Sequence, residues 1–209
     1  NNGLTGVPQV YAFTNLGRNI FAATNDGIFT TSDNGANWAA ASTGLPSEKA
    51  VLSLTVSGNS IFAGTYQGGL FLSTNLGVSW SRADNGIPVG AGILALAVSG
   101  ANVFAGTDKG LFVTNNNGGN WTPANTGLLP GVPITSLAVS GNLMFAGTYG
   151  AGVFVTNNNG LRWTPASRGI FTPGLNNPAN QLIIVSSLVI KQGTLFAGIT
   201  GQGVWVLKF

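Results

Sequence analysis

The side chains that could do chemistry are few in this sequence. The 209 residues include five Asp and Glu, eight Lys and Arg, and no Cys or His. This composition excludes thiolate chemistry, His-based triads and zinc sites ligated by Cys or His. We expect no metal site and no cofactor. The basic residues are scattered singly, so the sequence predicts no nucleic-acid partner.

Paired carboxylates are the remaining route to catalysis, because two facing acids can hydrolyse a glycosidic bond. Four acids fall in predicted loops at one edge of the repeated units described below: Asp26, Glu48, Asp84 and Asp108. Isolated acids in turns are typical of solvated surface charges. The sequence therefore predicts no catalytic residue, and a glycoside hydrolase is kept as the alternative function.

The chain is built from five copies of one repeated unit. A motif that begins Phe-Ala and continues with Gly or Ala recurs roughly every 42 residues, at Phe21, Phe62, Phe104, Phe145 and Phe196. Within a unit, short apolar runs alternate with Gly- and Asn-rich turns, which predicts four antiparallel strands. The one longer spacing contains residues 171–181, an insertion with the composition of a loop.

The faces of these predicted strands indicate how the units pack. Both faces are apolar or small, so each sheet must be covered on both sides. Four-stranded repeats of this length are typical of propellers, whereas an open solenoid is usually built from shorter repeats. We predict an all-β fold, a five-bladed beta-propeller of four-stranded antiparallel repeats. Residues 1–209 are expected to form a single domain that closes into a ring, with the last blade lacking its outer strand.

A second motif lies between the third and fourth predicted strands of four units, at 31–38, 73–80, 114–121 and 156–163. It resembles the Asp-box (BNR) repeat of sialidases and of many propellers without sialidase activity, including photosystem II assembly factor-like proteins. In such a turn the Asp or Asn caps backbone N–H groups, Gly takes positive φ, and Trp anchors the hairpin. We predict a structural role for Asp33, Gly35, Trp38, Asn75, Gly77, Trp80, Asn116, Gly118, Trp121, Asn158, Gly160 and Trp163.

The resemblance to sialidases also implies a catalytic arrangement that this chain lacks. Such an enzyme needs three arginines that grip a carboxylate, a tyrosine paired with a glutamate, and an aspartic acid. Here the single glutamate is Glu48, and the four arginines are Arg18, Arg82, Arg162 and Arg168. Two of these arginines lie in turns at the opposite edge from the usual site. We therefore predict that the protein is not an enzyme.

The turns between the second and third predicted strands are the best candidates for binding a ligand. They present side chains at equivalent places in successive units. Tyrosine rings can stack on sugars, while amides and carboxylates bind hydroxyl groups. The candidate ligand-binding residues are Asp26, Tyr66, Gln67, Asp108, Tyr149 and Gln202.

The composition favours an extracellular or cell-surface protein for recognition or assembly, with a carbohydrate or a protein as partner. Only 6% of the residues are charged, as in secreted bacterial proteins with these repeats. The most apolar stretch, 182–190, is short and contains two serines, so no transmembrane segment is expected. Strand 203–209 lacks a covering strand in this prediction, and we expect self-association by strand addition at this edge.

Overall fold

The computed structural model describes residues 2–4, 9–47, 50–166 and 183–209. Its strands form five antiparallel sheets in chain order, four with four strands and a last one with three. We call these sheets blades 1 to 5. The described residues contain no helix. The predicted all-β propeller fold and the three-stranded last blade are confirmed, whereas the insertion at 171–181 lies outside the described residues.

Each blade is a meander in which neighbouring strands follow one another in sequence. Blade 1 contains β1 (Val10–Leu16), β2 (Asn19–Thr24), β3 (Gly27–Thr31) and β4 (Ala39–Ala40). Blade 2 contains β5 (Val51–Ser57), β6 (Ser60–Thr65), β7 (Leu70–Ser73) and β8 (Ser81–Arg82). Blade 3 contains β9 (Ile93–Ser99), β10 (Asn102–Thr107), β11 (Gly110–Thr114) and β12 (Thr122–Pro123). Blade 4 contains β13 (Ile134–Ser140), β14 (Leu143–Thr148), β15 (Val153–Thr156) and β16 (Thr164–Pro165). Blade 5 contains β17 (Val185–Lys191), β18 (Thr194–Ile199) and β19 (Gly203–Lys208).

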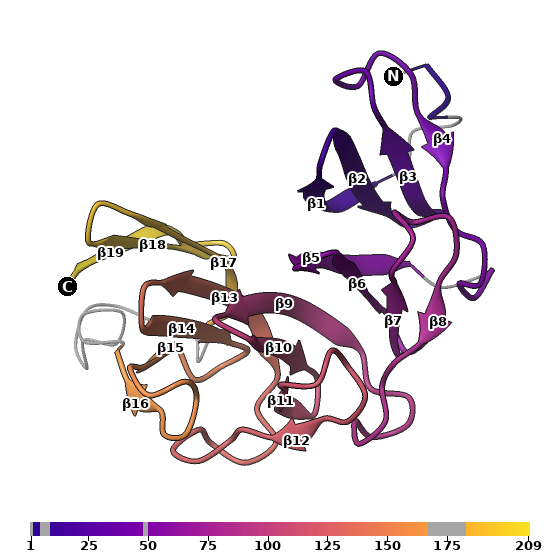
Figure 1. Ribbon diagram of the computed structural model, residues 1–209. Coiled ribbons are helices and arrows are strands. Elements are labelled where there is room, and N and C mark those ends of the chain that lie inside the picture. The colour runs from indigo at the N-terminus through magenta and orange to yellow at the C-terminus, as the bar shows by residue number, and fades with distance from the viewer. Residues whose placement is uncertain (1, 5–8, 48–49, 167–182) are drawn as a thin grey trace.

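The blades follow one another along an open arc, with blade 1 and blade 5 at its two ends (Figure 1). Their innermost strands contact each other in the order β1, β5, β9, β13 and β17. Among the described strands, no contact of comparable extent joins β17 back to β1. The expectation of a closed ring is therefore wrong, because five steps of the observed size do not complete a turn.

Consecutive blades share an apolar core, which we describe for blades 2 and 3. Phe62 and Leu70 of blade 2 pack with Val103, Phe112 and Trp121 of blade 3, and all five side chains are buried. The rings of Phe62 and Trp121 meet edge-on with centroids 6.3 Å apart. We call the side of a blade that faces the next blade its forward face, and the other side its backward face. Burial on both faces explains why these strands lack polar alternation.

Small residues in the second strands allow the blades to approach closely. A Cβ atom on Gly106 would lie 2.8 Å from Cγ2 of Ile134, which belongs to the innermost strand of the next blade. Gly64 meets Ile93 in the same way at 2.5 Å, and Gly147 would meet Val185. The glycine of the Phe-Ala-Gly motif thus provides room for the next blade.

Candidate functional site

The motif turns between the third and fourth strands form compact corners, of which the corner of blade 3 is typical. The hydroxyl of Thr114 donates to Oδ1 of Asn116 at 2.7 Å and accepts from the N–H of Gly118 at 3.2 Å. Oδ1 of Asn116 also accepts from the N–H of Asn120 at 3.0 Å. Gly118 has φ of +82°, a conformation that favours glycine. These groups are therefore bonded to one another within the turn.

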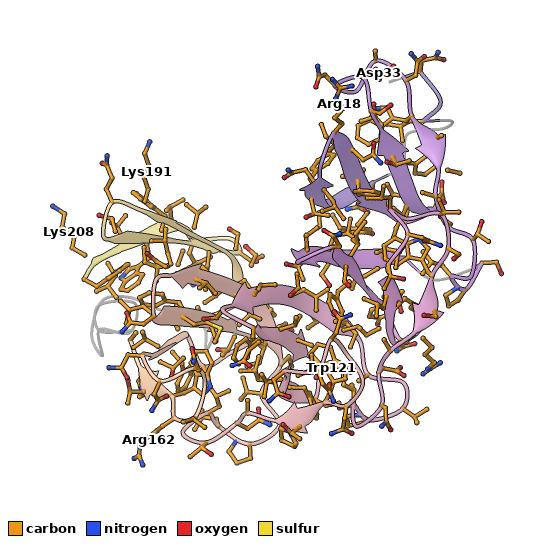
Figure 2. The ribbon with its side chains drawn as sticks, in the orientation of Figure 1. Arg18, Asp33, Trp121, Arg162, Lys191 and Lys208 are labelled. Carbon is orange, nitrogen blue, oxygen red and sulfur yellow. The ribbon has the colours of Figure 1, made fainter. Side chains whose placement is uncertain are left out.

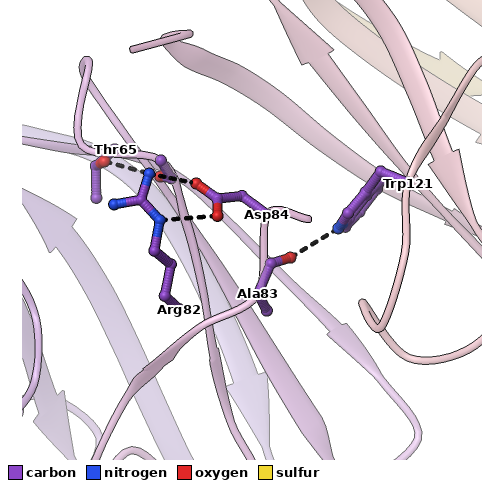
Figure 3. Close-up of polar contacts among 6 residues, drawn as sticks. Thr65, Arg82, Ala83, Asp84 and Trp121 are labelled. Atoms are coloured by element: carbon purple, nitrogen blue, oxygen red, sulfur yellow. Dashed lines mark hydrogen bonds and ion pairs between the residues drawn. The ribbon is translucent and has the colours of Figure 1, made fainter. Parts of the chain in front are cut away.

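In blades 2, 3 and 4 the tryptophan that ends the corner forms a hydrogen bond with the preceding blade. The indole N–H of Trp121 donates to the backbone oxygen of Ala83 at 2.7 Å (Figure 3). Trp80 and Trp163 make the same bond to the alanine oxygens of blades 1 and 3. Figure 2 shows Trp121 among closely packed side chains. Trp38 differs, because no acceptor for its indole N–H occurs in the part of the chain that the structure describes.

Asp33 is the one carboxylate among these corners. The backbone N–H of Asn37 donates to Oδ1 of Asp33 at 2.9 Å, and the Asn37 side-chain amide donates to Oδ2 at 2.8 Å. The Thr31 hydroxyl donates a third bond at 2.7 Å. Hydrogen bonds to the ionised form lower the pKa of the Asp33 carboxyl to about 2, with the Asn37 backbone bond as the largest cause. A carboxyl with so low a pKa is unsuited to act as a general acid near neutral pH.

The turns between the second and third strands lie at the opposite edge of the blades and are held in one common way. In every blade the N–H of the first turn residue donates to the carbonyl oxygen just before the innermost strand of the same blade. The pairs are Asn25 with Gln9, Tyr66 with Ala50, Asp108 with Gly92, Tyr149 with Pro133, and Thr200 with Ile184. We call the edge that carries these turns the rim. The bonds fix the backbone of the rim while leaving most of its side chains exposed.

Three of the six candidate residues gather around one backbone position, Gly92. Oδ1 of Asp108 accepts from the N–H of Gly92 at 3.0 Å. A Cβ atom on Gly92 would lie 3.8 Å from Cδ2 of Tyr66 and 3.9 Å from the backbone nitrogen of Gln67. Tyr66 comes from blade 2 and Asp108 from blade 3, so this group spans the junction of two blades. We call Tyr66, Gln67 and Asp108 the Gly92 cluster.

The other three candidates lie on separate blades. Asp26 is exposed in the turn of blade 1, where its N–H donates to the Thr24 hydroxyl at 3.0 Å. Tyr149 is exposed in blade 4, and Gln202 is exposed in blade 5. Among the described residues, no hydrogen bond joins any of these three side chains to the Gly92 cluster. The rim therefore presents one local cluster and several isolated side chains.

Sequence reasoning left three charged residues near the rim out of the candidate set. Lys109 pairs with Asp108, with Nζ 3.1 Å from Oδ2. Arg82 forms two bonds with Asp84, as Figure 3 shows. Nε donates to Oδ1 at 2.8 Å, and Nη2 lies 2.8 Å from Oδ2. This pair lies against the turn of blade 2, because a Cβ atom on Gly69 would contact both side chains. The signal was the i, i+2 spacing of Arg82 and Asp84, which places two side chains on one side of an extended chain.

The carboxylates are dispersed. Asp26, Asp84 and Asp108 belong to three different blades, and Asp33 lies in a corner at the opposite edge. Glu48 and Arg168 lie outside the described residues. Within the described ranges, no group of three or more His, Cys, Asp or Glu side chains could hold a metal ion.

Cavities in the structure occur on the corner side of the blades as well as near the rim. One of 660 Å³ lies on blade 1 and is lined by residues that include Thr14, Asn15, Ile20 and Asn34. Another, of 490 Å³, lies between blades 2 and 3 and includes Arg82 and Asp84 in its lining. The described residues form no helix of the length and hydropathy that crossing a bilayer requires.

Comparison with known protein families gives a match over most of the chain. The model of the DUF6242 beta propeller domain matches residues 7–142. The chain belongs to this family. The five consecutive blades and their shared cores are what a propeller family requires. No curated protein sequence matches the chain.

Solved structures with the same fold differ widely in what they do. The extracellular domain of the putative one component system BT4673 from B. thetaiotaomicron has a TM-score of 0.74 at 20% identity, covering 99% of this chain and 28% of that one. YCF48 bound to D1 peptide has a TM-score of 0.71 at 16% identity, covering 98% and 64%. The GH74 xyloglucanase from Xanthomonas campestris has a TM-score of 0.67 at 16% identity, covering 91% and 34%. The chain thus spans less than two thirds of each of these proteins, and the likeness establishes the fold alone.

Proposed function

We propose that this chain is a non-catalytic recognition module that acts outside the cell or at the cell surface, and that the Gly92 cluster binds a carbohydrate. The observation that carries the proposal is that the ring of Tyr66 and the carboxylate of Asp108 both lie at Gly92, beside the backbone of Gln67 at one junction of the rim. The corners are proposed to be structural, because their polar groups bond within the turn.

The chemistry of the cluster suits a sugar. The Tyr66 ring is 53% exposed and offers an apolar face to the C–H groups of a pyranose. The Gln67 side chain, on the next residue of the same turn, is exposed and carries both donors and an acceptor. Asp108 is oriented by the N–H of Gly92 and by Lys109, so its remaining acceptor capacity has a fixed direction. Because the backbone is already held, binding orders few groups and loses little entropy.

Two observations support action outside the cell. Charged residues make up only 6% of the sequence, as expected for secreted propellers of this kind. One of the similar structures is an extracellular domain.

The glycoside hydrolase alternative has weaker support, although one similar structure is a xyloglucanase. Hydrolysis of a glycoside needs two carboxyl groups on opposite sides of the scissile bond. Asp108 accepts from the N–H of Gly92 and pairs with Lys109. Asp84 pairs with Arg82, and the pKa of the Asp33 carboxyl is lowered. Asp84 and Asp33 are thus engaged in contacts within the protein, so neither is offered to pair with Asp108 across a scissile bond.

The test is binding on an array of neutral oligosaccharides, followed by calorimetry with the best binder. We expect Tyr66→Ala to weaken binding about 10-fold and Tyr66→Phe to bind normally, because the ring face makes the contact. Tyr11→Ala is the matched control, since Tyr11 is 41% exposed but lies in β1 away from the cluster. Equal losses in Tyr11→Ala and Tyr66→Ala would contradict the site. Silence on the array with binding on a peptide array would replace the carbohydrate by a protein partner, and turnover of any glycoside would contradict the non-catalytic assignment.

A further inference from the structure

The described Lys and Arg residues fall into two groups according to the edge of the blades on which they lie. Near the rim, Arg82 and Lys109 each pair with an acid. We call the opposite edge the corner edge. It holds the corners and the turns between the first and second strands, residues 17–18, 58–59, 100–101, 141–142 and 192–193. The remaining described cations all lie there: Arg18, Arg162, Lys191 and Lys208.

The cations of the corner edge are exposed, and among the described residues none of them pairs with an acid. Lys191 and Lys208 lie on either side of Thr194 in the sheet of blade 5. Figure 2 shows Arg162, Lys191 and Lys208 extending away from the ribbon. Asp33 is the one described acid on this edge, whereas near the rim the described acids outnumber the cations by three to two. The corner edge is therefore the basic side of the described molecule.

Three large apolar side chains are exposed on the same edge. Leu76 is 50% exposed and Val78 is 71% exposed in the corner of blade 2, and Leu161 is 76% exposed in the corner of blade 4. The corner of blade 3 has Asn117 and Gly119 at the positions of Leu76 and Val78. A corner of this kind therefore folds without apolar side chains at these positions.

Leu76 has a backbone conformation that leucine rarely adopts. Its φ is +59°, and the equivalent Asn34, Asn117 and Asn159 have φ of +58°, +56° and +55°. Asparagine tolerates this left-handed region better than leucine does. Leu76 is also half exposed, so burial does not offset the strain. A strained residue that folding does not require indicates a functional role.

Successive corners lie side by side, so these side chains belong to one continuous edge. A Cβ atom on Gly77, in the corner of blade 2, would lie 2.7 Å from Cε1 of Phe21 in blade 1. The side-chain amide of Asn117, in the corner of blade 3, donates to the Ser60 hydroxyl of blade 2 at 3.1 Å. A hydrogen bond at the same place joins blades 3 and 4.

We infer that the corner edge binds the surface of a bilayer that contains anionic lipids. Basic side chains are attracted to the negative potential of such a surface, and exposed apolar side chains enter the boundary between headgroups and acyl chains. A bilayer is favoured over a soluble polyanion, because a polyanion offers no apolar phase to Leu76, Val78 and Leu161. In this arrangement the rim faces away from the bilayer. The inference is independent of carbohydrate binding at the rim.

The first test is co-sedimentation with vesicles of phosphatidylcholine mixed with phosphatidylglycerol, compared with vesicles of phosphatidylcholine alone. We expect wild type to bind only the anionic vesicles and to be released as salt is raised, because salt screens the attraction. Arg162→Gln should weaken binding about 5-fold. Arg82→Gln is the matched control, since it removes the same charge near the rim, and it should bind like wild type. Equal losses in the two variants, or no binding of wild type to anionic vesicles, would overturn the inference.

The second test concerns the apolar side chains of the corner edge. We expect Val78→Ser to weaken vesicle binding about 5-fold, because less apolar surface enters the bilayer. Val89→Ser is the matched control and should bind like wild type. Val89 is 95% exposed in the connection between blades 2 and 3, three residues before Gly92 of the rim. Circular dichroism checks that both variants fold. Equal binding by Val78→Ser and wild type would contradict insertion of this corner.

Leu76→Asn separates a role in binding from a role in folding. It supplies the residue that the other three corners carry, so the urea midpoint is expected to equal or exceed that of wild type. Vesicle binding is expected to weaken about 10-fold. A lower urea midpoint for Leu76→Asn would overturn the functional role of Leu76. Binding to soluble polyphosphate as tight as binding to anionic vesicles, and unchanged in Val78→Ser, would replace the bilayer by a soluble polyanion.

Discussion

The contribution of the tryptophan hydrogen bonds between blades can be measured by replacing Trp with Phe at two equivalent positions, Trp121 and Trp38. Trp121 is 2% exposed, and its indole N–H donates to the Ala83 oxygen at 2.7 Å. Replacement by Phe leaves that carbonyl without its donor, which costs about 1–3 kcal/mol. The smaller ring adds a cavity term of about 1 kcal/mol. We therefore expect Trp121→Phe to lower the free energy of unfolding by about 2–4 kcal/mol.

The matched substitution is Trp38→Phe. Trp38 is only partly buried, and no acceptor faces its indole N–H within the described ranges. The expected loss is under about 1 kcal/mol, because the substitution breaks no bond between described blades. Urea unfolding followed by far-ultraviolet circular dichroism measures both variants at a concentration where the wild type is monomeric. Equal losses at the two positions would refute the claim that the tryptophans stabilise the arc through bonds to the preceding blade.

Further predictions concern the corners and the spacing of the blades. Because the pKa of Asp33 is lowered to about 2 from 3.8, its stabilising contribution is complete above about pH 4 and is lost as the pH falls through 2. Asp33→Asn should remove this part of the acid dependence, and an NMR titration that places the Asp33 pKa near 4 would contradict it. Gly106→Ala should cost about 1–3 kcal/mol, because its Cβ would lie 2.9 Å from the backbone oxygen of Ile134. Gly92→Ala, whose nearest contact is 3.8 Å away, should unfold at nearly the wild-type urea concentration, and equal midpoints for the two glycine variants would exclude steric crowding as the cause.

The repeat allowed much of the fold to be predicted from the sequence. Strand positions follow from short apolar runs between turn residues, as in β9 and β11. Burial of both strand faces follows from runs such as 103–106, in which every residue is apolar or small and neither face is polar. These features are local, so a single unit reveals them.

The features that the sequence could not supply depend on how one blade sits on the next. The angle between blades is set by the packing of side chains such as Phe62 and Trp121, and no local pattern states whether five such angles close a ring. The Gly92 cluster joins residues from two blades at a backbone contact. Tyr66 and Tyr149 occupy equivalent positions in their turns, so the sequence alone does not show that Tyr66 belongs to a cluster and Tyr149 does not. The tertiary structure therefore determines which of the candidate ligand-binding residues lie close together.

We propose that the corners join the blades and that the rim binds the ligand. Titration of a ¹⁵N-labelled sample with the oligosaccharide that binds best on the array tests this division most directly. We expect chemical-shift changes centred on Tyr66, Gln67 and Asp108, with the corner amides of Asp33 and Asn116 unchanged. Changes centred on the corners instead would contradict it.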